Sequence, residues 1–321
     1  MKYYISFDLG GTKVVAAVLD GNFNILSRSK EKSGADKGPD AVYKVICKVI
    51  ENACSQVDVK LSKVAAIGGC APGVVCPKTG LVVNAPNLGF YNFPLQEKLA
   101  KDFKVPVVIE NDVNAGLYGE LKFGAAKGYE NVIAISPGTG IGGGIVINGK
   151  LYRGAMGGAG EFGHIVVQPD GPLCGCGQRG CLEAIASRTT ISMQLASFSI
   201  RGRMPIIAEA ANGNLKKIKS GLIAKAYNAG DEDVKAIVHH AAKYLGVGMA
   251  NLVNCFNPEA VILGGGLIEA LPEPFTSISA KVMRESALGD MGKNVDVKEA
   301  KLGDDAVIMG AAELARETTS S

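Results

Sequence analysis

The chain carries one strand–turn–strand pattern twice, and this repeat restricts the folds that are open to it. The first copy, residues 4–21, places a Gly-rich turn between two apolar segments and ends in Asp-Gly. The second copy, residues 132–149, has the same layout and ends in Asn-Gly. Because Asp-Gly and Asn-Gly between apolar segments are strong hairpin signals, each copy predicts two antiparallel strands. A third strand is expected after each, at 24–29 and 150–152, and two such three-stranded units predict an α/β protein of two similar domains.

The segments outside the repeat extend this prediction. The helix that begins near Asn114 is expected to cross between the domains, and the helix over 306–316 to pack back on the first domain. We therefore expect a smaller domain of residues 1–118 and 302–321, and a larger domain of residues 119–301 that contains the Cys-rich motif described below. Residues 70–92 are rich in Gly, Pro and Asn and predict a long loop. Apolar periodicity predicts further helices over 39–57, 95–103 and 231–254, and buried strands over 64–68, 107–110 and 260–263.

Length and composition exclude several classes of protein. The 321 residues suffice for about two domains, and a hydrophobic content of 47% supplies a large core. The net charge is only +3 and Lys and Arg form no run, so the sequence does not support a basic patch for nucleic acid. It shows neither a signal-peptide layout nor an apolar stretch of membrane-spanning length. We therefore expect a soluble, cytoplasmic protein without a membrane partner.

Three cysteines within eight residues form the most chemically specific motif of the chain. Zinc prefers four nitrogen and sulfur ligands in a tetrahedron, and the glycines between the cysteines allow sharp turns around one ion. Glu161 and Glu183 flank the motif and would lie beside the metal. Reduced, unliganded thiols are the alternative, and a disulfide is disfavoured in a cytosolic protein. The predicted zinc ligands are His164, Cys174, Cys176 and Cys181.

The turn of the first repeat copy has the composition of a phosphate-binding site. Gly10 and Gly11 let backbone N–H groups approach phosphate oxygens closely, and Thr12 and Lys13 add a hydroxyl and a cation. Asp8, at the strand end, is suited to hold Mg²⁺ through water. The alternative is a tight hairpin without a ligand. The turn is not a P-loop, because that consensus is absent and no helix follows.

The second copy repeats the turn as Gly138-Thr139-Gly140. Two such turns are suited to bind the two ends of a triphosphate, which favours a nucleotide as the ligand. Gly264 to Gly266 end another buried strand, where ligands of α/β proteins usually bind, and Gly265 is expected to approach the base or ribose. A plain turn before a helix is the alternative for these glycines.

Glu110-Asn111-Asp112 ends a predicted strand and carries the candidate catalytic group. A carboxylate beside an amide can orient a sugar hydroxyl and accept its proton. In phosphoryl transfer one Asp assists the attacking hydroxyl, while other groups position the reactants and neutralise charge. The local sequence equally allows Asp112 to cap the next helix.

Together these motifs resemble the ROK family of sugar kinases and sugar-responsive repressors. They occur in that family's order, and the likeness covers essentially the whole chain; the Cys motif and Gly160-Glu-Phe-Gly-His164 are specific to the family. The resemblance implies an actin/hexokinase-like (ribonuclease H-like) ATPase fold, α/β, with two similar domains and an interdomain cleft. The other motifs that carry it are Asp8 to Lys13, Glu110 to Ala115, Gly138 to Gly140 and Cys174 to Glu183.

The resemblance also implies roles for single residues. Asp112 would act as the catalytic base on a sugar hydroxyl, with ATP and Mg²⁺ in the cleft. His164 would direct one ring nitrogen to a structural zinc and the other to the sugar. The sugar ligands would be Asn87, Asn111, Asp112, Glu161, His164 and Glu183. The ATP site would be lined by Gly10, Gly11, Thr12, Gly138, Thr139 and Gly140, and zinc would be held by His164, Cys174, Cys176 and Cys181.

Within the family, Ala71 to Gly73 and Asn84 to Gly89 look most like bacterial glucokinases, which implies ATP-dependent conversion of glucose to glucose 6-phosphate. Phe90 departs from that branch, which often has Trp there, and this leaves the sugar preference open. Kinases of N-acetylmannosamine, N-acetylglucosamine or fructose are the alternatives among enzymes. A sugar-responsive repressor is the alternative of another class, and it would need a DNA-binding segment ahead of Asp8. Family likeness also suggests a homo-oligomer, either a homodimer or a higher assembly.

Overall fold

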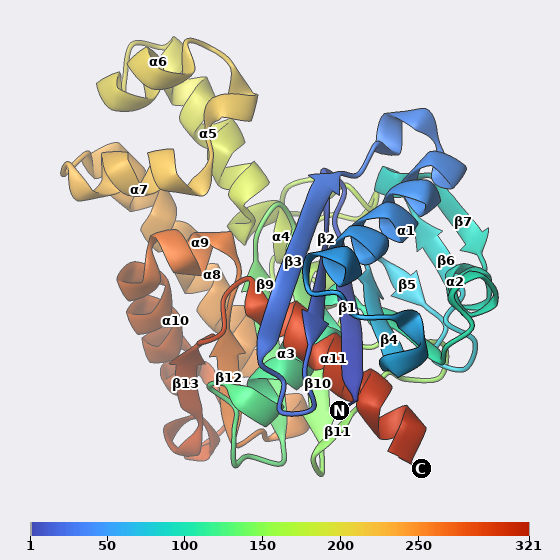
Figure 1. Ribbon diagram of the computed structural model, residues 1–321. Coiled ribbons are helices and arrows are strands. Elements are labelled where there is room, and N and C mark those ends of the chain that lie inside the picture. The colour runs from blue at the N-terminus through green and yellow to red at the C-terminus, as the bar shows by residue number, and fades with distance from the viewer. Residues whose placement is uncertain (1, 321) are drawn as a thin grey trace. The chain divides into compact units, whose positions relative to one another are not determined.

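The computed structural model describes residues 2–320, and the chain divides into two compact units (Figure 1). Unit 1 comprises Met1–Gly128, Lys150–Ala159 and Asp304–Ser321, and unit 2 comprises Tyr129–Gly149 and Gly160–Gly303. Each unit is built on its own mixed β-sheet with packed helices. The expected two-domain α/β fold is thereby confirmed.

The sheet of unit 1 combines the first repeat copy with two later strands. β1 and β2 form the predicted antiparallel hairpin, in which Asp8 lies opposite Val15, and β3 continues it. β4 pairs parallel with β1, and β8 pairs parallel with β4. The order is β3-β2-β1-β4-β8, and the strands are β1 (Tyr3–Leu9), β2 (Lys13–Leu19), β3 (Ile25–Lys32), β4 (Val64–Ala71) and β8 (Val107–Asn111).

Helices cover both faces of this sheet. α1 and α2 contribute Ile46 and Leu99 to a fully buried apolar cluster that contains Phe7 of β1. On the other face α11 packs on β1, β4 and α3, as predicted for this helix. The approach is close, because a Cβ on Gly68 of β4 would lie 2.0 Å from the Ala311 carbonyl oxygen. The helices are α1 (Pro39–Gln56), α2 (Leu95–Phe103), α3 (Asp112–Phe123) and α11 (Asp305–Ser320).

Residues 70–92, predicted to form a loop, form a small antiparallel sheet instead, so that prediction was wrong. Val75, Val82 and Phe90 of this segment are buried in the apolar cluster of unit 1. This burial stabilises very short strands, while the turns between them contain Pro77, Gly80, Pro86, Asn87 and Gly89. The order is β5-β6-β7, with β5 (Val74–Val75), β6 (Val82–Ala85) and β7 (Phe90–Phe93).

Two segments distinguish unit 1 from the expected smaller domain. α3 lies wholly in unit 1 and does not cross into unit 2. It packs tightly against α11, since a Cβ on Gly119 would come 2.1 Å from the Ala306 carbonyl oxygen. Residues 150–159 also belong to unit 1, where Arg153 forms an ion pair with Glu110 of β8.

The sheet of unit 2 repeats the pairing of unit 1. β9 and β10 form the second predicted antiparallel hairpin, β12 pairs parallel with β9, and β13 pairs parallel with β12. The order β10-β9-β12-β13 therefore matches β2-β1-β4-β8 of unit 1, which confirms the internal repeat. The strands are β9 (Val132–Pro137), β10 (Ile141–Ile147), β12 (Ala260–Leu263) and β13 (Asp296–Glu299), and the two-residue β11 (Lys150–Leu151) follows β10 in sequence.

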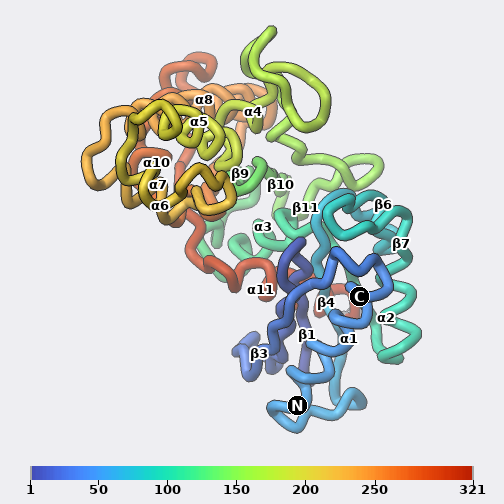
Figure 2. The backbone as a smooth tube through the Cα atoms, turned by 90° about the horizontal axis from the view of Figure 1, so that it is seen from above, coloured from blue at the N-terminus to red at the C-terminus, as the bar shows by residue number. Residues whose placement is uncertain are grey.

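The helices of unit 2 gather beside one another in both views (Figures 1 and 2). α8 and α10 pack closely, because a Cβ on Gly246 would lie 2.7 Å from the Ser279 carbonyl oxygen. Within residues 2–320, none of the helices combines the length and apolar character that crossing a membrane requires. The helices are α4 (Glu183–Ala186), α5 (Arg188–Ile200), α6 (Pro205–Ala211), α7 (Ser220–Asn228), α8 (Glu232–Phe256), α9 (Gly266–Ala270) and α10 (Pro272–Ser286). Short 3₁₀ turns cover Ala35–Lys37, Leu61–Lys63, Pro86–Leu88, Phe162–His164, Leu215–Lys217 and Met291–Asn294.

Candidate active site

The β1–β2 turn of unit 1 forms a cradle of free backbone N–H groups. The N–H of Gly10 donates to the Lys13 carbonyl at 2.9 Å, which closes the turn. Ser33 restrains it from outside, because its hydroxyl donates to the Gly11 carbonyl at 2.7 Å and its N–H donates to the Thr12 carbonyl at 3.1 Å. Among residues 2–320, the N–H groups of Gly11 and Thr12 have no acceptor. Two consecutive free amides at a restrained turn are suited to bind a phosphate oxygen.

Charged side chains line the same turn. Burial raises the pKa of the Asp8 carboxyl, and the nearby positive charge of Lys13 partly opposes that shift. The Lys13 Nζ atom lies 3.7 Å from a carboxylate oxygen of Asp304, at the start of the α11 region. Asp8 thus offers a hard oxygen ligand next to a phosphate cradle, which fits Mg²⁺ held through water. Asn87 lies close by, since a Cβ on Gly11 would come 3.9 Å from the Asn87 Cβ atom.

Asn111, not Asp112, caps helix α3. The Asn111 Oδ1 atom accepts from the N–H groups of Val113 and Asn114 at 2.9 and 3.0 Å, and its side-chain amide donates to the Gly73 carbonyl at 3.0 Å. Asp112 is the first helical residue, and its Oδ1 atom accepts from the N–H of Val113 at 2.9 Å. The cap of α3 is therefore Asn111, and the capping alternative for Asp112 is wrong.

The carboxyl of Asp112 has an unusual affinity for protons. Its desolvated position raises the pKa of Asp112 to about 6, and the negative charge of Asp8 acts in the same direction. The N–H of Val113 opposes the shift by stabilising the charged form. A carboxylate with a pKa close to neutrality is suited to accept a proton from a reacting hydroxyl.

A buried ion pair supports this segment, and sequence reasoning missed it. Glu110 is buried, and its Oε2 atom accepts from Arg153 Nε at 2.6 Å. Its Oε1 atom accepts from the N–H of Asn111 and the side chain of Asn114, at 3.0 and 3.2 Å. Glu110 thereby fixes the junction of β8 and α3, at which Asp112 sits. No local pattern predicts the pairing, because Arg153 follows Glu110 by 43 residues.

The β9–β10 turn of unit 2 has the same design as the first turn. The N–H of Gly138 donates to the Gly140 carbonyl at 2.8 Å, and the N–H groups of Thr139 and Gly140 find no acceptor in the described part of the chain. Gly265 lies against the end of the same strand, since a Cβ there would come 2.6 Å from the Ser136 hydroxyl. Its φ of 83° also favours glycine. The structure therefore brings the predicted turn and the predicted Gly265 together.

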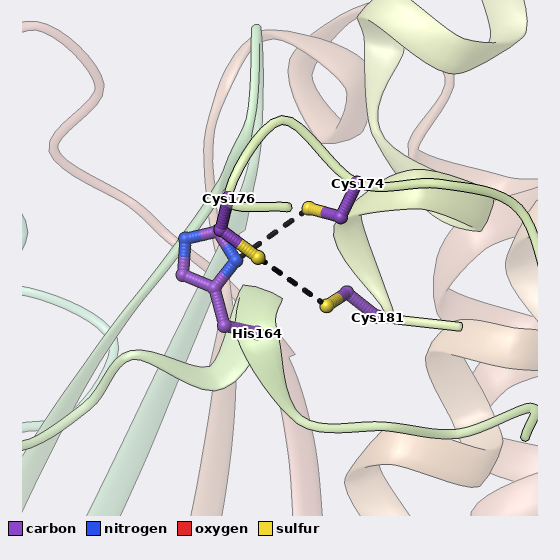
Figure 3. A group of neighbouring side chains, drawn as sticks. All are labelled: His164, Cys174, Cys176 and Cys181. Atoms are coloured by element: carbon purple, nitrogen blue, oxygen red, sulfur yellow. Dashed lines mark hydrogen bonds between the residues drawn. The ribbon is translucent and has the colours of Figure 1, made fainter. Parts of the chain in front are cut away.

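The four predicted zinc ligands converge in unit 2 (Figure 3). Cys174 Sγ lies 3.7 Å from His164 Nδ1, and the Sγ atoms of Cys176 and Cys181 lie 3.8 Å apart. All four ligand atoms lie within 4.8 Å of one another. A tetrahedron with metal–sulfur bonds of about 2.3 Å has edges of about 3.8 Å, so the donor set fits one zinc ion.

A short hairpin positions the cysteines. Antiparallel bridges join Leu173 to Arg179 and Val166 to Cys181, which brings the two ends of the motif together. Gly180 is required between them: its φ is 77°, and a Cβ would lie 1.7 Å from the Gln168 carbonyl oxygen. The ligand geometry thus follows from backbone contacts within the segment.

Glu183 lies between the β9–β10 turn and the zinc-type cluster, which consists of His164, Cys174, Cys176 and Cys181. Its Oε2 atom accepts from the N–H of Ile141 at 2.9 Å, directly after the turn, and its Oε1 atom lies 3.9 Å from Cys174 Sγ. Glu161 is exposed and immediately precedes the 3₁₀ turn that carries His164. Because Nδ1 of His164 faces Cys174, Nε2 is left for a different partner. Of the predicted sugar ligands, Asn87, Asn111 and Asp112 belong to unit 1, and the other three to unit 2.

Comparisons with known proteins agree with this geometry. The sequence model of the ROK family matches residues 4–318. The glucokinase of Streptomyces coelicolor is 38% identical over 316 residues, which cover 98% of this chain and 97% of that protein. The xylose repressor of Bacillus subtilis is 32% identical, over 86% of this chain and 67% of the repressor. A ROK family glucokinase from Streptomyces griseus, solved in complex with glucose and AMPPNP, matches with a TM-score of 0.84 and 36% identity over 98% of this chain and 99% of its own. The chain therefore belongs to the ROK family.

Proposed function

We propose that this protein transfers the γ-phosphoryl group of ATP to the 6-hydroxyl of a hexose, with glucose as the preferred substrate. It is an ATP-dependent sugar kinase of the ROK family, as its glucokinase relatives indicate over their full length. The observation that carries the proposal is the Asp112 carboxylate, desolvated at the start of α3 with a pKa of about 6. Such a group is suited to act as the base in phosphoryl transfer to a hydroxyl.

In the proposed reaction, Asp112 accepts the proton of the 6-hydroxyl while the hydroxyl oxygen attacks the γ-phosphorus. The bond from that phosphorus to the bridging oxygen breaks, and ADP and hexose 6-phosphate are formed. The turns at Gly10-Gly11-Thr12 and Gly138-Thr139-Gly140 bind phosphate oxygens through their free N–H groups. Asp8 would hold Mg²⁺, which would neutralise phosphate charge.

We assign binding of the sugar to side chains that surround these groups. Asn111 is rigid as the cap of α3, and Glu183 is fixed by the N–H of Ile141. Zinc on Nδ1 of His164 would fix the imidazole ring, so that Nε2 is directed to a sugar hydroxyl. The full proposed set is Asn87, Asn111, Asp112, Glu161, His164 and Glu183. We further propose that the protein works in the cytoplasm as a homodimer, without a nucleic-acid partner.

A panel of sugars tests the substrate assignment. Initial rates of ADP formation at fixed ATP should give glucose a kcat/KM at least about 10-fold above that of N-acetylmannosamine, with mannose between them. An N-acetyl group at carbon 2 replaces a hydroxyl and needs additional space, which leaves buried polar groups unpaired. A preference for N-acetylmannosamine, N-acetylglucosamine or fructose would overturn the glucose assignment and leave the kinase assignment intact.

The pH dependence tests the role of Asp112. The base acts only when it is ionised, and burial holds its pKa at about 6. We therefore expect kcat/KM to be constant above about pH 7 and to fall about tenfold per unit below pH 6. Rates should be measured with the coupling enzymes in excess at every pH. An acid limb near pH 4, the range of an ordinary Asp, would contradict the assignment.

A further inference from the structure

The β1–β2 turn and the β9–β10 turn, both proposed to bind phosphate, differ in which residue supplies a positive charge. The first turn contains Lys13 in its own sequence, and Asp304 lies 3.7 Å from the Lys13 ammonium. The second turn, Gly138-Thr139-Gly140, contains no charged residue. A site for a polyphosphate needs positive charge or charged hydrogen-bond donors, because backbone amides supply only partial charge.

Arg188 supplies that cation from the first position of α5. Its Nη2 atom donates to the Thr139 hydroxyl at 2.6 Å, and its backbone N–H donates to the Gly138 carbonyl at 2.9 Å. The neighbouring Thr189 hydroxyl donates to the Thr139 carbonyl at 2.6 Å. These hydrogen bonds restrain the carbonyl groups of the turn, just as Ser33 restrains the carbonyl groups of the β1–β2 turn in unit 1. They leave the free N–H groups of the turn available to a ligand.

The guanidinium of Arg188 retains binding capacity. Arginine has five N–H donors, and within the described chain only the bond to Thr139 uses one of them. No carboxylate of residues 2–320 lies within ion-pair distance of it, although other arginines of unit 2, such as Arg203, are paired. A partly exposed, unpaired arginine hydrogen-bonded to a turn with free amides is the arrangement that binds phosphate oxygens with a planar fork.

We propose that Arg188 is a nucleotide-binding residue that contacts a phosphate group of ATP or ADP at the second turn. The proposal rests on the nucleotide role proposed for Gly138 to Gly140. The arginine adds the charge that this turn lacks, and the Thr139 hydroxyl sets the direction of the guanidinium.

Titration calorimetry and kinetics on Arg188→Ala test the proposal. ADP affinity should fall about 10–100-fold, as expected for the loss of a charge-assisted hydrogen bond, and the KM for ATP should rise to a similar extent. Affinity for adenosine and for glucose should change less than about twofold, because neither carries a phosphate. Arg188→Lys, which keeps the charge but not the fork, should fall between wild type and Arg188→Ala.

Two further variants distinguish direct binding of phosphate by Arg188 from a purely structural role of Arg188 in the turn. Thr139→Ala removes the bond to the guanidinium but leaves the cation, so its loss of ADP affinity should be clearly smaller than that of Arg188→Ala. Arg201→Ala is the matched control, since Arg201 is exposed at the other end of α5 and contacts the ring of Phe198. It should bind ADP as the wild type does, with the same melting temperature.

The outcomes distinguish this inference from the function on which it rests. If wild type phosphorylates glucose with ATP but Arg188→Ala binds ADP normally, the inference is wrong and the kinase function stands. Equal losses for adenosine and ADP would show that Arg188 only braces the turn. Selective loss of glucose 6-phosphate affinity, with ADP affinity unchanged, would place the arginine on the sugar-phosphate product instead and overturn the proposal.

Discussion

Replacing Asp112 by Asn should lower kcat about 10²–10⁴-fold, because the variant loses the group that takes the proton from the sugar hydroxyl. Sugar affinity should be retained, since Asn has the same size and can still accept the N–H of Val113. The chain has no Trp, so binding is best followed by titration calorimetry. Wild-type kcat in this variant would show that Asp112 serves binding or structure only.

The same variant should fold at least as stably as the wild type. Burial raises the pKa of Asp112 from 3.8 to about 6, so the carboxyl favours folding below its unfolded pKa and loses that contribution as pH rises through 6. At pH 7.5 the ionised, desolvated carboxylate therefore opposes folding, and Asn removes this penalty. The melting temperature of Asp112→Asn should equal or exceed that of wild type. Asp58→Asn, at an exposed position of unit 1, is the control that should alter neither kcat nor stability.

Removing one cysteine of the His164–Cys181 cluster is the second change with a large expected effect. Purified protein should contain about one zinc per chain, and Cys176→Ala should lose most of it, because the tetrahedron is left with three ligands. We expect kcat/KM for the sugar to fall about 10–100-fold, since His164 and Glu183 lose their fixed orientation. Metal analysis and kinetics on the same preparation give both readouts.

A matched control variant separates this effect from general damage. Cys255 is an exposed cysteine in α8 of the same unit, so Cys255→Ala should keep both zinc and activity. An active wild-type preparation without zinc would refute the metal assignment. Full activity of Cys176→Ala after zinc loss would instead show that the metal does not orient the sugar ligands.

The local structure that the sequence predicted correctly lies in short, contiguous segments of the chain. The hairpins follow from apolar strands around Gly turns and Asx-Gly ends, and the order of pairing follows from their repetition. His164, Cys174, Cys176 and Cys181 lie within 18 residues, so residue type and spacing sufficed to predict that they converge, and zinc binding stays a prediction. Gly265 follows a buried strand and lies against the end of β9, and its role in binding ATP stays a prediction.

The parts that sequence reasoning missed depend on contacts between distant residues. Arg153 meets Glu110 across 43 residues, and Arg188 meets Thr139 across 49 residues, and neither arginine stands in a recognisable motif. The sheet of residues 74–93 could not be predicted, because its strands are too short to show an alternation of apolar and polar residues. Helices α5 and α7 were not predicted because Ser, Thr and Gly interrupt their apolar stripes, and α6 was not predicted because its seven residues make fewer than two complete helical turns.

The position of α11 in the sequence has a consequence for biosynthesis. This helix covers one face of the unit 1 sheet, yet all of Gly160–Gly303 is translated between that sheet and the helix. At about 5–20 residues per second, the ribosome needs on the order of 10–35 s to make the chain from Tyr129 to Gly303. During this interval the nascent strands expose Tyr4, Ala17 and Ala66, which α11 later buries. The first unit therefore completes its core only after the second has been synthesised, and in that interval its exposed apolar strands make the nascent chain prone to aggregation.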